Sequence, residues 1–262
     1  MTASSHKPSM LVEMFQGPHS INPVIGGLES DAGYRTSNVN GFQNAKDNAF
    51  DNINTQAGDP LDFPTSAVTM GIASSSANDT SAGTGARTVL IQGLDESFNE
   101  IQEVVTLSGQ TKVETSNQYF RINFLQVLTV GSAGNNQGDI WIADTADTFT
   151  SGVPSTPVNS ITNFWSKSYN SIFTVPAGYS ASFGLMRAGC FTNNASFIPR
   201  ARVVSGAWQR LGFFTLNAGT QIGMDLGTVG KFPTGTDLEI QAAAVTSTAR
   251  VWALCPIFLL PN

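Results

Sequence analysis

The segment Ile101-Gln102-Glu103-Val104-Val105-Thr106-Leu107, closed by Ser108-Gly109, indicates most clearly which kind of fold the chain adopts. It is rich in β-branched residues, and a turn-forming Ser-Gly pair ends it. Side chains branched at Cβ pack well on a pleated surface, and a turn at the end of such a run is typical of a strand. We therefore predict a β-strand here rather than a helix.

The same kind of segment recurs on both sides of this one. In Ala67–Ala73 the residue types alternate along the chain, which is the period of a strand. Tyr119–Val130 predicts a long strand in which the apolar side chains change from one face to the other. The spacing is mostly about 8 to 15 residues, which is the rhythm of a sandwich or jelly roll. The other predicted strands are Arg87–Gly93, Asp139–Ala143, Ile172–Tyr179, Ser180–Cys190, Phe197–Val204, Leu211–Leu216, Gln221–Leu226, Asp237–Val245 and Ala249–Leu260.

Helix signals are nearly absent, so the fold class that we predict is all-β. The strands fit one jelly-roll-like β-sandwich of roughly ten to twelve antiparallel strands over residues 59–262. The alternative is a split near residue 155, in the loop that contains Pro154 and Pro157, into two small β-sandwiches. At this length both arrangements can bury a full core.

Residues 1–58 differ from the rest of the chain. They are rich in Asn, Asp and Gly, and they show neither the period of a strand nor that of a helix. Their isolated apolar residues are spaced like anchors along an extended arm, which we expect to lie on a neighbouring subunit; the alternative is that the arm lies on its own body. The predicted subunit-interface anchors are Leu11, Met14, Phe15, Ile25, Phe42 and Phe50.

The composition favours a protein that is in contact with other chains. Only 12% of the residues are charged, against about a quarter in an ordinary domain. Ser, Thr and Asn (26, 26 and 20 residues) supply most of the polar character instead. The net charge of -6 argues against a nucleic-acid-binding surface, and no apolar run reaches the roughly 18 residues of a membrane helix. Residues 1–9 lack the apolar core of a secretion signal, so we expect synthesis and assembly in a host cytoplasm.

Few residues are suited to catalysis or to metal binding. The two histidines, His6 and His19, both lie in the predicted arm, away from any nucleophile of the body. Cys190 and Cys255 fit no metal or redox spacing; we expect buried thiols and leave a disulfide between them open. We therefore predict no enzyme, no cofactor and no metal site, and leave open whether an oxygen-rich loop near Asp139 binds calcium.

Four residues of the body are candidates for surface contacts. Trp165 and Trp208 lie beside loops, where an exposed aromatic ring suits subunit docking or sugar binding, although core packing is the more ordinary role. Arg200 and Arg202 share one face of a strand, because side chains alternate along it. We expect this pair to meet carboxylates of a neighbouring subunit.

Several segments of the body resemble a known family. They are Phe63–Met70, Gly83–Val89, Glu103–Gly109 and Phe173–Gly178, and in this order they resemble virion structural proteins of tailed bacteriophages. The resemblance covers roughly residues 60 to 260 and does not include the arm. It implies a component of the particle without catalytic chemistry, and it does not say which part of the particle.

The sequence as a whole predicts a non-enzymatic structural protein of a phage virion. We expect a capsid decoration or cement protein that acts through subunit packing and exchange of its N-terminal arm. The expected partners are copies of itself, with a homotrimer favoured, and other virion proteins such as the major capsid protein. The alternatives are a tail, neck or baseplate component, and a module that recognises a host glycan.

Overall fold

The computed structural model describes residues 35–54, 61–226 and 230–262. In these ranges the chain forms twenty strands, β1 to β20, and no α-helix. The prediction of an all-β protein built from antiparallel sheets is confirmed. The same described ranges contain no helix long and apolar enough to cross a membrane.

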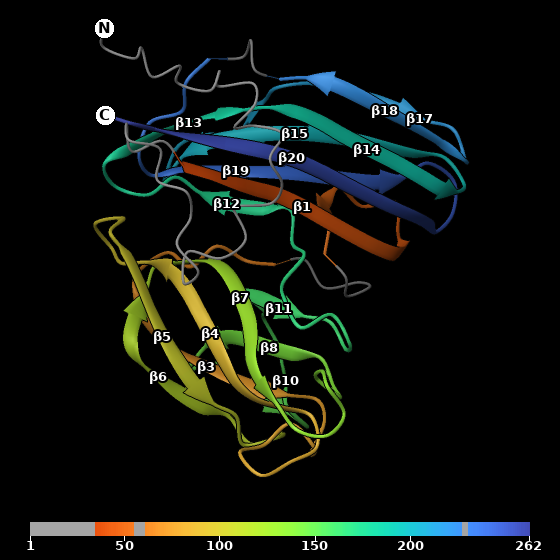
Figure 1. Cartoon of the computed structure of the whole chain (residues 1–262). Helices are drawn as coiled ribbons and strands as arrows, with labels where there is room; N and C mark the ends of the chain where they lie inside the picture. Colours follow the sequence, from red (N-terminus) through yellow and green to blue (C-terminus); the bar gives the residue numbers. More distant parts are fainter. Residues whose placement is uncertain (1–34, 55–60, 227–229) are drawn as a thin grey trace, which may run out of the picture.

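Both ends of the described chain build one sandwich, here called the terminal sandwich (residues 35–54 and 172–262; Figure 1). Its first sheet is centred on β20, which pairs with β1 on one side and with β13 and β14 on the other. The strands of this sheet are β1 (Arg35–Lys46), β20 (Ala249–Pro261), β13 (Tyr179–Phe183), β14 (Leu185–Thr192) and β18 (Thr220–Asp225).

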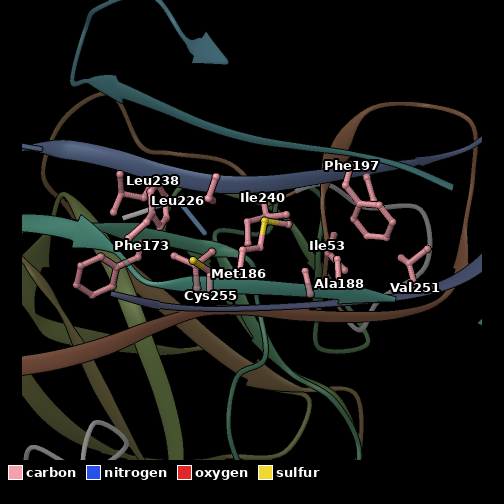
Figure 2. Packing of buried hydrophobic residues seen from close by; sticks show 14 of the residues in the cluster. Ile53, Phe173, Met186, Ala188, Phe197, Leu226, Leu238, Ile240, Val251 and Cys255 are labelled. Atoms are coloured by element: carbon pink, nitrogen blue, oxygen red, sulfur yellow. The ribbon is translucent and has the colours of Figure 1, made fainter. Parts of the chain in front are cut away.

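The second sheet of the terminal sandwich is centred on β19, whose nine residues are all buried. Buried side chains of the two sheets meet in one hydrophobic core, where Met186 and Cys255 of the first sheet lie near Ile240 of the second (Figure 2). The strands of this sheet are β2 (Asp51–Asn52), β12 (Ile172–Thr174), β15 (Ala195–Val203), β16 (Gln209–Arg210), β17 (Phe214–Leu216) and β19 (Thr236–Ala244).

The middle of the chain forms a second body, here called the inner sandwich (residues 61–161; Figure 1). It has its own hydrophobic cluster, which includes Ile72, Ile91 and Leu125. One sheet contains β3 (Val68–Ser74), β6 (Val113–Tyr119), β8 (Ile140–Asp144) and β11 (Asn159–Ile161); the other contains β4 (Ala86–Leu94), β5 (Glu100–Thr106) and β7 (Arg121–Val130); and β9 (Phe149–Thr150) pairs with β10 (Val153–Pro154).

The hydrophobic clusters of the two sandwiches have no residue in common. Because β11 still pairs with β8, the chain passes from the inner to the terminal sandwich only after Ile161, beyond the loop in which the alternative split was placed. The predicted domain boundaries, including that alternative, stay predictions.

The described part of the predicted arm includes a long strand of the body. β1 pairs with β20 of the same chain over almost its whole length, from Arg35 opposite Leu259 to Lys46 opposite Ala249. The positions of β1 that face the core are occupied by Val39, Gly41 and Gln43. Only one of these is a large apolar residue, so the alternation that marks a strand is hidden in the sequence.

Buried polar contacts fix the far end of β1. The Lys46 side chain is 1% exposed, and its Nζ lies 2.5 Å from an oxygen of Asp47 and 2.7 Å from one of Asp51. Burial raises the pKa of Asp51, and the Lys46 ammonium opposes that shift. The turn from β1 to β2 is thus held by ionic contacts within one chain.

Candidate functional site

The loop between the two sandwiches has an unusual backbone. Phe164 and Ser166 have φ values of +69° and +57°, in the left-handed region that residues with a side chain seldom adopt. The Phe164 side chain is 62% exposed, so core packing does not explain its conformation. Residues with such strained backbone conformations are concentrated at functional sites, where the surrounding structure holds them in place.

The buried side chain of Asn136 helps to hold this loop in place. Asn136 is fully buried, and its Nδ2 donates hydrogen bonds to the carbonyl oxygens of Gly138 (2.7 Å) and Thr162 (2.8 Å). The backbone N–H of Ser166 donates to Asn136 Oδ1 at 3.0 Å. Asn136 therefore compensates two backbone groups of this loop, the Thr162 carbonyl and the Ser166 N–H, as well as the carbonyl of Gly138 just before β8.

Trp165 stands between the two strained residues and connects the loop to β1. Its ring lies 5.4 Å from the ring of Phe42 and 4.8 Å, edge to face, from that of Tyr169. Trp165 and Phe42 were predicted from separate parts of the sequence as a surface contact and an arm anchor. The structure brings them together in one aromatic cluster of the same chain.

The aromatic cluster continues across the outer face of the first sheet. The Arg250 guanidinium lies 5.9 Å from the ring centre of Phe42 on β1 and 5.9 Å from that of Phe191 on β14. Phe191 is 53% exposed. Arginine over aromatic rings, partly open to solvent, is a composition common in protein interfaces.

Beyond Arg250, the outer face of β20 carries an apolar stripe. Alternate residues of β20 from Ala249 to Leu259 point into the core and are buried, while the residues between them are half-buried on the other face. The apolar stripe consists of Trp252, Leu254, Pro256, Phe258 and Leu260. The exposed side chains of Leu185 and Phe191 on β14 lie beside it and widen the apolar area.

Two glycines beside the stripe, Gly189 on β14 and Gly184 between β13 and β14, leave room for its rings. A Cβ at Gly189 would lie 2.2 Å from Nε1 of Trp252, and a Cβ at Gly184 would lie 2.7 Å from a ring carbon of Phe258. Glycine at these two positions makes room for the large rings of β20. None of the predicted site residues belongs to the stripe, although the predicted strand Ala249–Leu260 is apolar on both faces.

The remaining predicted arm anchors are placed as follows. Phe50 is 43% exposed and lies 6.4 Å, ring to ring, from the exposed Phe213 of its own chain. Leu11, Met14, Phe15 and Ile25 lie outside the described residues. The contact of all these anchors with a neighbouring subunit stays a prediction.

Trp208, Arg200 and Arg202 form a second cluster, and their contacts lie within the chain. Arg200 Nε donates to Glu239 at 2.5 Å, and Arg202 Nε donates to Asp237 at 3.0 Å. Both guanidinium groups lie over the Trp208 ring, at 4.0 and 4.5 Å from its centre. The adjacent strand β19 supplies a carboxylate of the same chain to each of these arginines, and the expected contact with carboxylates of a neighbouring subunit stays a prediction.

The Asp237 carboxylate also joins the two sandwiches. Asp237 of β19 is fully buried and accepts hydrogen bonds from Arg121 of β7 at 2.9 and 3.1 Å, and from Thr174 at 2.6 Å. Arg121 is 3% exposed and also donates to the carbonyl oxygen of Pro64. An arginine inside the apolar strand Tyr119–Val130 was the one sequence signal of this buried junction.

The ionisable groups of these clusters make structural contacts or are buried. Burial raises the pKa of Glu239, and the charge of Arg200 opposes the shift. Burial also raises the pKa of Cys190, and that of Cys255 to about 12, which keeps both free thiols protonated. Asp139, in the loop where calcium was considered, accepts a hydrogen bond from the backbone N–H of Asn163. Within the described ranges, no three His, Cys, Asp or Glu side chains are grouped so that they could hold a metal ion.

Comparison with known proteins identifies no family. No protein-family model matches the chain, and no curated protein sequence is significantly similar to it. The comparisons add no support for the tailed-phage family, so that resemblance stays a prediction.

The structural matches are weak. The structure of the infectious bursal disease virus Gt strain matches 87% of this chain and 72% of its own at 10% identity, with a TM-score of 0.25. T=1 particles derived from the same virus match 86% and 72% at 11% identity, with a TM-score of 0.23. The VP2 subviral particle of that virus matches 87% and 72% at 8% identity, with a TM-score of 0.22. TM-scores of this size do not establish a common fold.

Proposed function

We propose that the protein is a non-enzymatic structural subunit of a virus particle, which acts by packing its first sheet against other chains. The observation that carries the proposal is the apolar stripe on the outer face of β20, together with the exposed Leu185 and Phe191 beside it. The stripe is half-buried and these two side chains are exposed, and apolar side chains gathered on one face in this way favour an interaction surface. The virion part of the proposal rests on the sequence resemblance.

The composition and the stripe support each other. A surface with few charges has little ionic desolvation to overcome when it meets another surface, since burying charged groups is costly. Complete burial of a Leu or Phe side chain stabilises by about 1.5–3 kcal/mol. Covering the exposed parts of several such side chains therefore contributes several kcal/mol to subunit association.

The finer role within this proposal is capsid decoration on a tailed phage, with arm exchange between copies in a homotrimer and contacts with the major capsid protein. Light scattering on the purified full chain tests the oligomer, for which we expect a mass three times the 27.7 kDa of one chain. A stable monomer at all concentrations would contradict it. Tail, neck and baseplate positions are the alternative locations, which immunogold labelling of particles separates.

A second candidate function is recognition of a host glycan. The observation that favours it is the strained loop, which exposes Phe164 and, to 37%, Trp165. Aromatic faces of this kind suit stacking on sugar rings. A glycan array with the wild type and the Phe164→Ala and Trp165→Ala variants tests this function, and the absence of binding by the wild type to every glycan would end it.

Self-association of the full chain tests the primary proposal. We expect the variant Leu254→Asp, which places a charge in the middle of the stripe, to weaken association at least tenfold in sedimentation equilibrium. The matched control is Val104→Asp, because Val104 is 54% exposed on the inner sandwich and is also apolar. Equal association of both variants and the wild type would show that the stripe is not the interface.

A further inference from the structure

We propose that the apolar stripe of β20 is the binding site for residues 1–34 of a second copy of this chain. The inference rests on the proposed function and adds to it the surface on which the N-terminal segment docks. The stripe is defined by described residues, and the docking segment lies outside them.

β20 carries apolar side chains on both of its faces. Its inward positions are small or aliphatic and its outward positions are Trp, Leu, Pro, Phe and Leu. A strand that is apolar on both faces is typical of a sheet covered on both sides. The second sheet of the terminal sandwich covers the inner face, and the outer face is still only half-buried.

β1 begins at one end of the stripe. Arg35, the first residue of β1, lies opposite Leu259, at the Leu260 end of the stripe. Its side chain is held by an ion pair with Glu100 of the inner sandwich, and its guanidinium lies 5.2 Å from the ring centre of Tyr179. These contacts fix the direction of β1 at its first residue.

This exit favours a second copy over the same copy. Because β1 begins opposite Leu259, the segment joins the body at one end of its own stripe, whereas the stripe of a second copy can be approached along its whole length. Thirty-four extended residues reach about 110 Å, while the stripe spans about 27 Å. The segment is thus long enough to cross to a neighbour and to cover its stripe completely.

The N-terminal segment and the stripe are chemically complementary. The segment contains the predicted anchors Leu11, Met14, Phe15 and Ile25, and its charged side chains are Lys7, Glu13, Glu29 and Asp31. The stripe is flanked by the exposed guanidinium groups of Arg187 and Arg250, while the carboxylate Asp225 lies farther away on β18. A segment with spaced apolar anchors and an acidic excess fits an apolar stripe with a basic margin.

Disulfide trapping in the full chain tests the proposal. Two differently tagged copies are co-expressed, one with Leu254→Cys and the other with Leu11→Cys, Phe15→Cys or Ile25→Cys, and are then mildly oxidised. We expect at least one of the three pairs to give a disulfide-linked dimer with both tags. The native thiols are buried, Cys190 at 2% and Cys255 at 0% exposure, and do not compete.

Two controls make each outcome decisive. Arg187→Cys with Leu254→Cys in one chain joins residues that are opposite each other in β14 and β20, so it shows that a thiol in the stripe can be oxidised. Val104→Cys replaces Leu254→Cys as an acceptor outside the stripe and is expected to give no dimer. The inference is overturned if the Arg187→Cys/Leu254→Cys control forms its disulfide and none of the three arm cysteines gives a dimer with Leu254→Cys. It is also overturned if an arm cysteine and Leu254→Cys form a disulfide only when both are in the same chain at low protein concentration.

The two proposals fail in different ways. A protein whose self-association is abolished by Leu254→Asp but which gives no cross-link with the arm retains the proposed function, and the occupant of the stripe is then another surface. A protein that does not self-associate at all overturns both proposals.

Discussion

Ser166 has a backbone conformation that is unfavourable for a residue with a side chain. At φ +57° a residue with a Cβ is less stable by about 1–2 kcal/mol, and glycine lacks this cost but loses about 0.5–1 kcal/mol of chain entropy. We expect Ser166→Gly to raise the free energy of unfolding by about 0.5–1 kcal/mol. Urea denaturation measures the change, and Ser166→Ala, which keeps the Cβ, is the control expected to show no gain.

Asp237 is the residue on which the junction of the two sandwiches depends. Its carboxylate accepts hydrogen bonds from Arg121, Arg202 and Thr174, and it is fully buried. Removing its charge leaves the buried Arg121 without its counter-ion, so we expect Asp237→Asn to lower the free energy of unfolding by about 3–5 kcal/mol.

The control for Asp237 removes a single hydrogen bond of the same network. Thr174→Val deletes the hydroxyl that donates to Asp237, and we expect a loss of about 1 kcal/mol. Equal losses for the two variants in chemical denaturation would contradict a central role of the carboxylate.

Among the elements, β1 depends on a glycine. A Cβ at Gly41 would lie 2.3 Å from the backbone oxygen of Ile53 and 2.7 Å from its Cβ. Backbone does not move aside easily, so we expect Gly41→Ala to destabilise the protein by about 1–3 kcal/mol. Thr36→Ala, at an exposed position of the same strand, is expected to change stability by less than about 0.5 kcal/mol in the same thermal or urea unfolding experiment.

The strands that could be predicted from the sequence are those whose residue types alternate along the chain or are rich in β-branched residues. Ala67–Ala73 and Ile101–Leu107 correspond closely to β3 and β5, because their pattern and the turns beside them are strong. β1 could not be predicted, since its core positions include Gly41 and Gln43. Close packing on Ile53 requires a residue with no side chain there, and this need arises only in the folded structure.

The candidate site was predicted in part. Trp165 and Phe42 were chosen for being aromatic near loops or in the arm, and no local pattern could show that their rings meet. No local pattern could show that Arg200 and Arg202 pair with carboxylates of their own chain, because strand register decides which carboxylate is opposite each arginine. The left-handed backbone at Phe164 gives no sequence signal, since neither glycine nor asparagine occupies that position.

At the scale of the whole molecule, we propose that the two sandwiches are separate folding units. Each has its own hydrophobic cluster, and Ile72 of the inner sandwich and Ile240 of the terminal sandwich are both fully buried. Truncating a buried Ile to Ala costs about 2–5 kcal/mol, largely through the cavity that it leaves. The ionic contacts at the junction are few enough for one sandwich to unfold before the other.

Differential scanning calorimetry of the full chain distinguishes the two arrangements. We expect two transitions, with Ile72→Ala lowering the midpoint of one and Ile240→Ala lowering that of the other, because each cavity weakens only the core that contains it. We also expect Asp237→Asn to lower both midpoints, since its carboxylate joins residues of both sandwiches. One transition that moves equally with all three variants would mean that the chain folds as a single unit, as the one-sandwich prediction from the sequence requires.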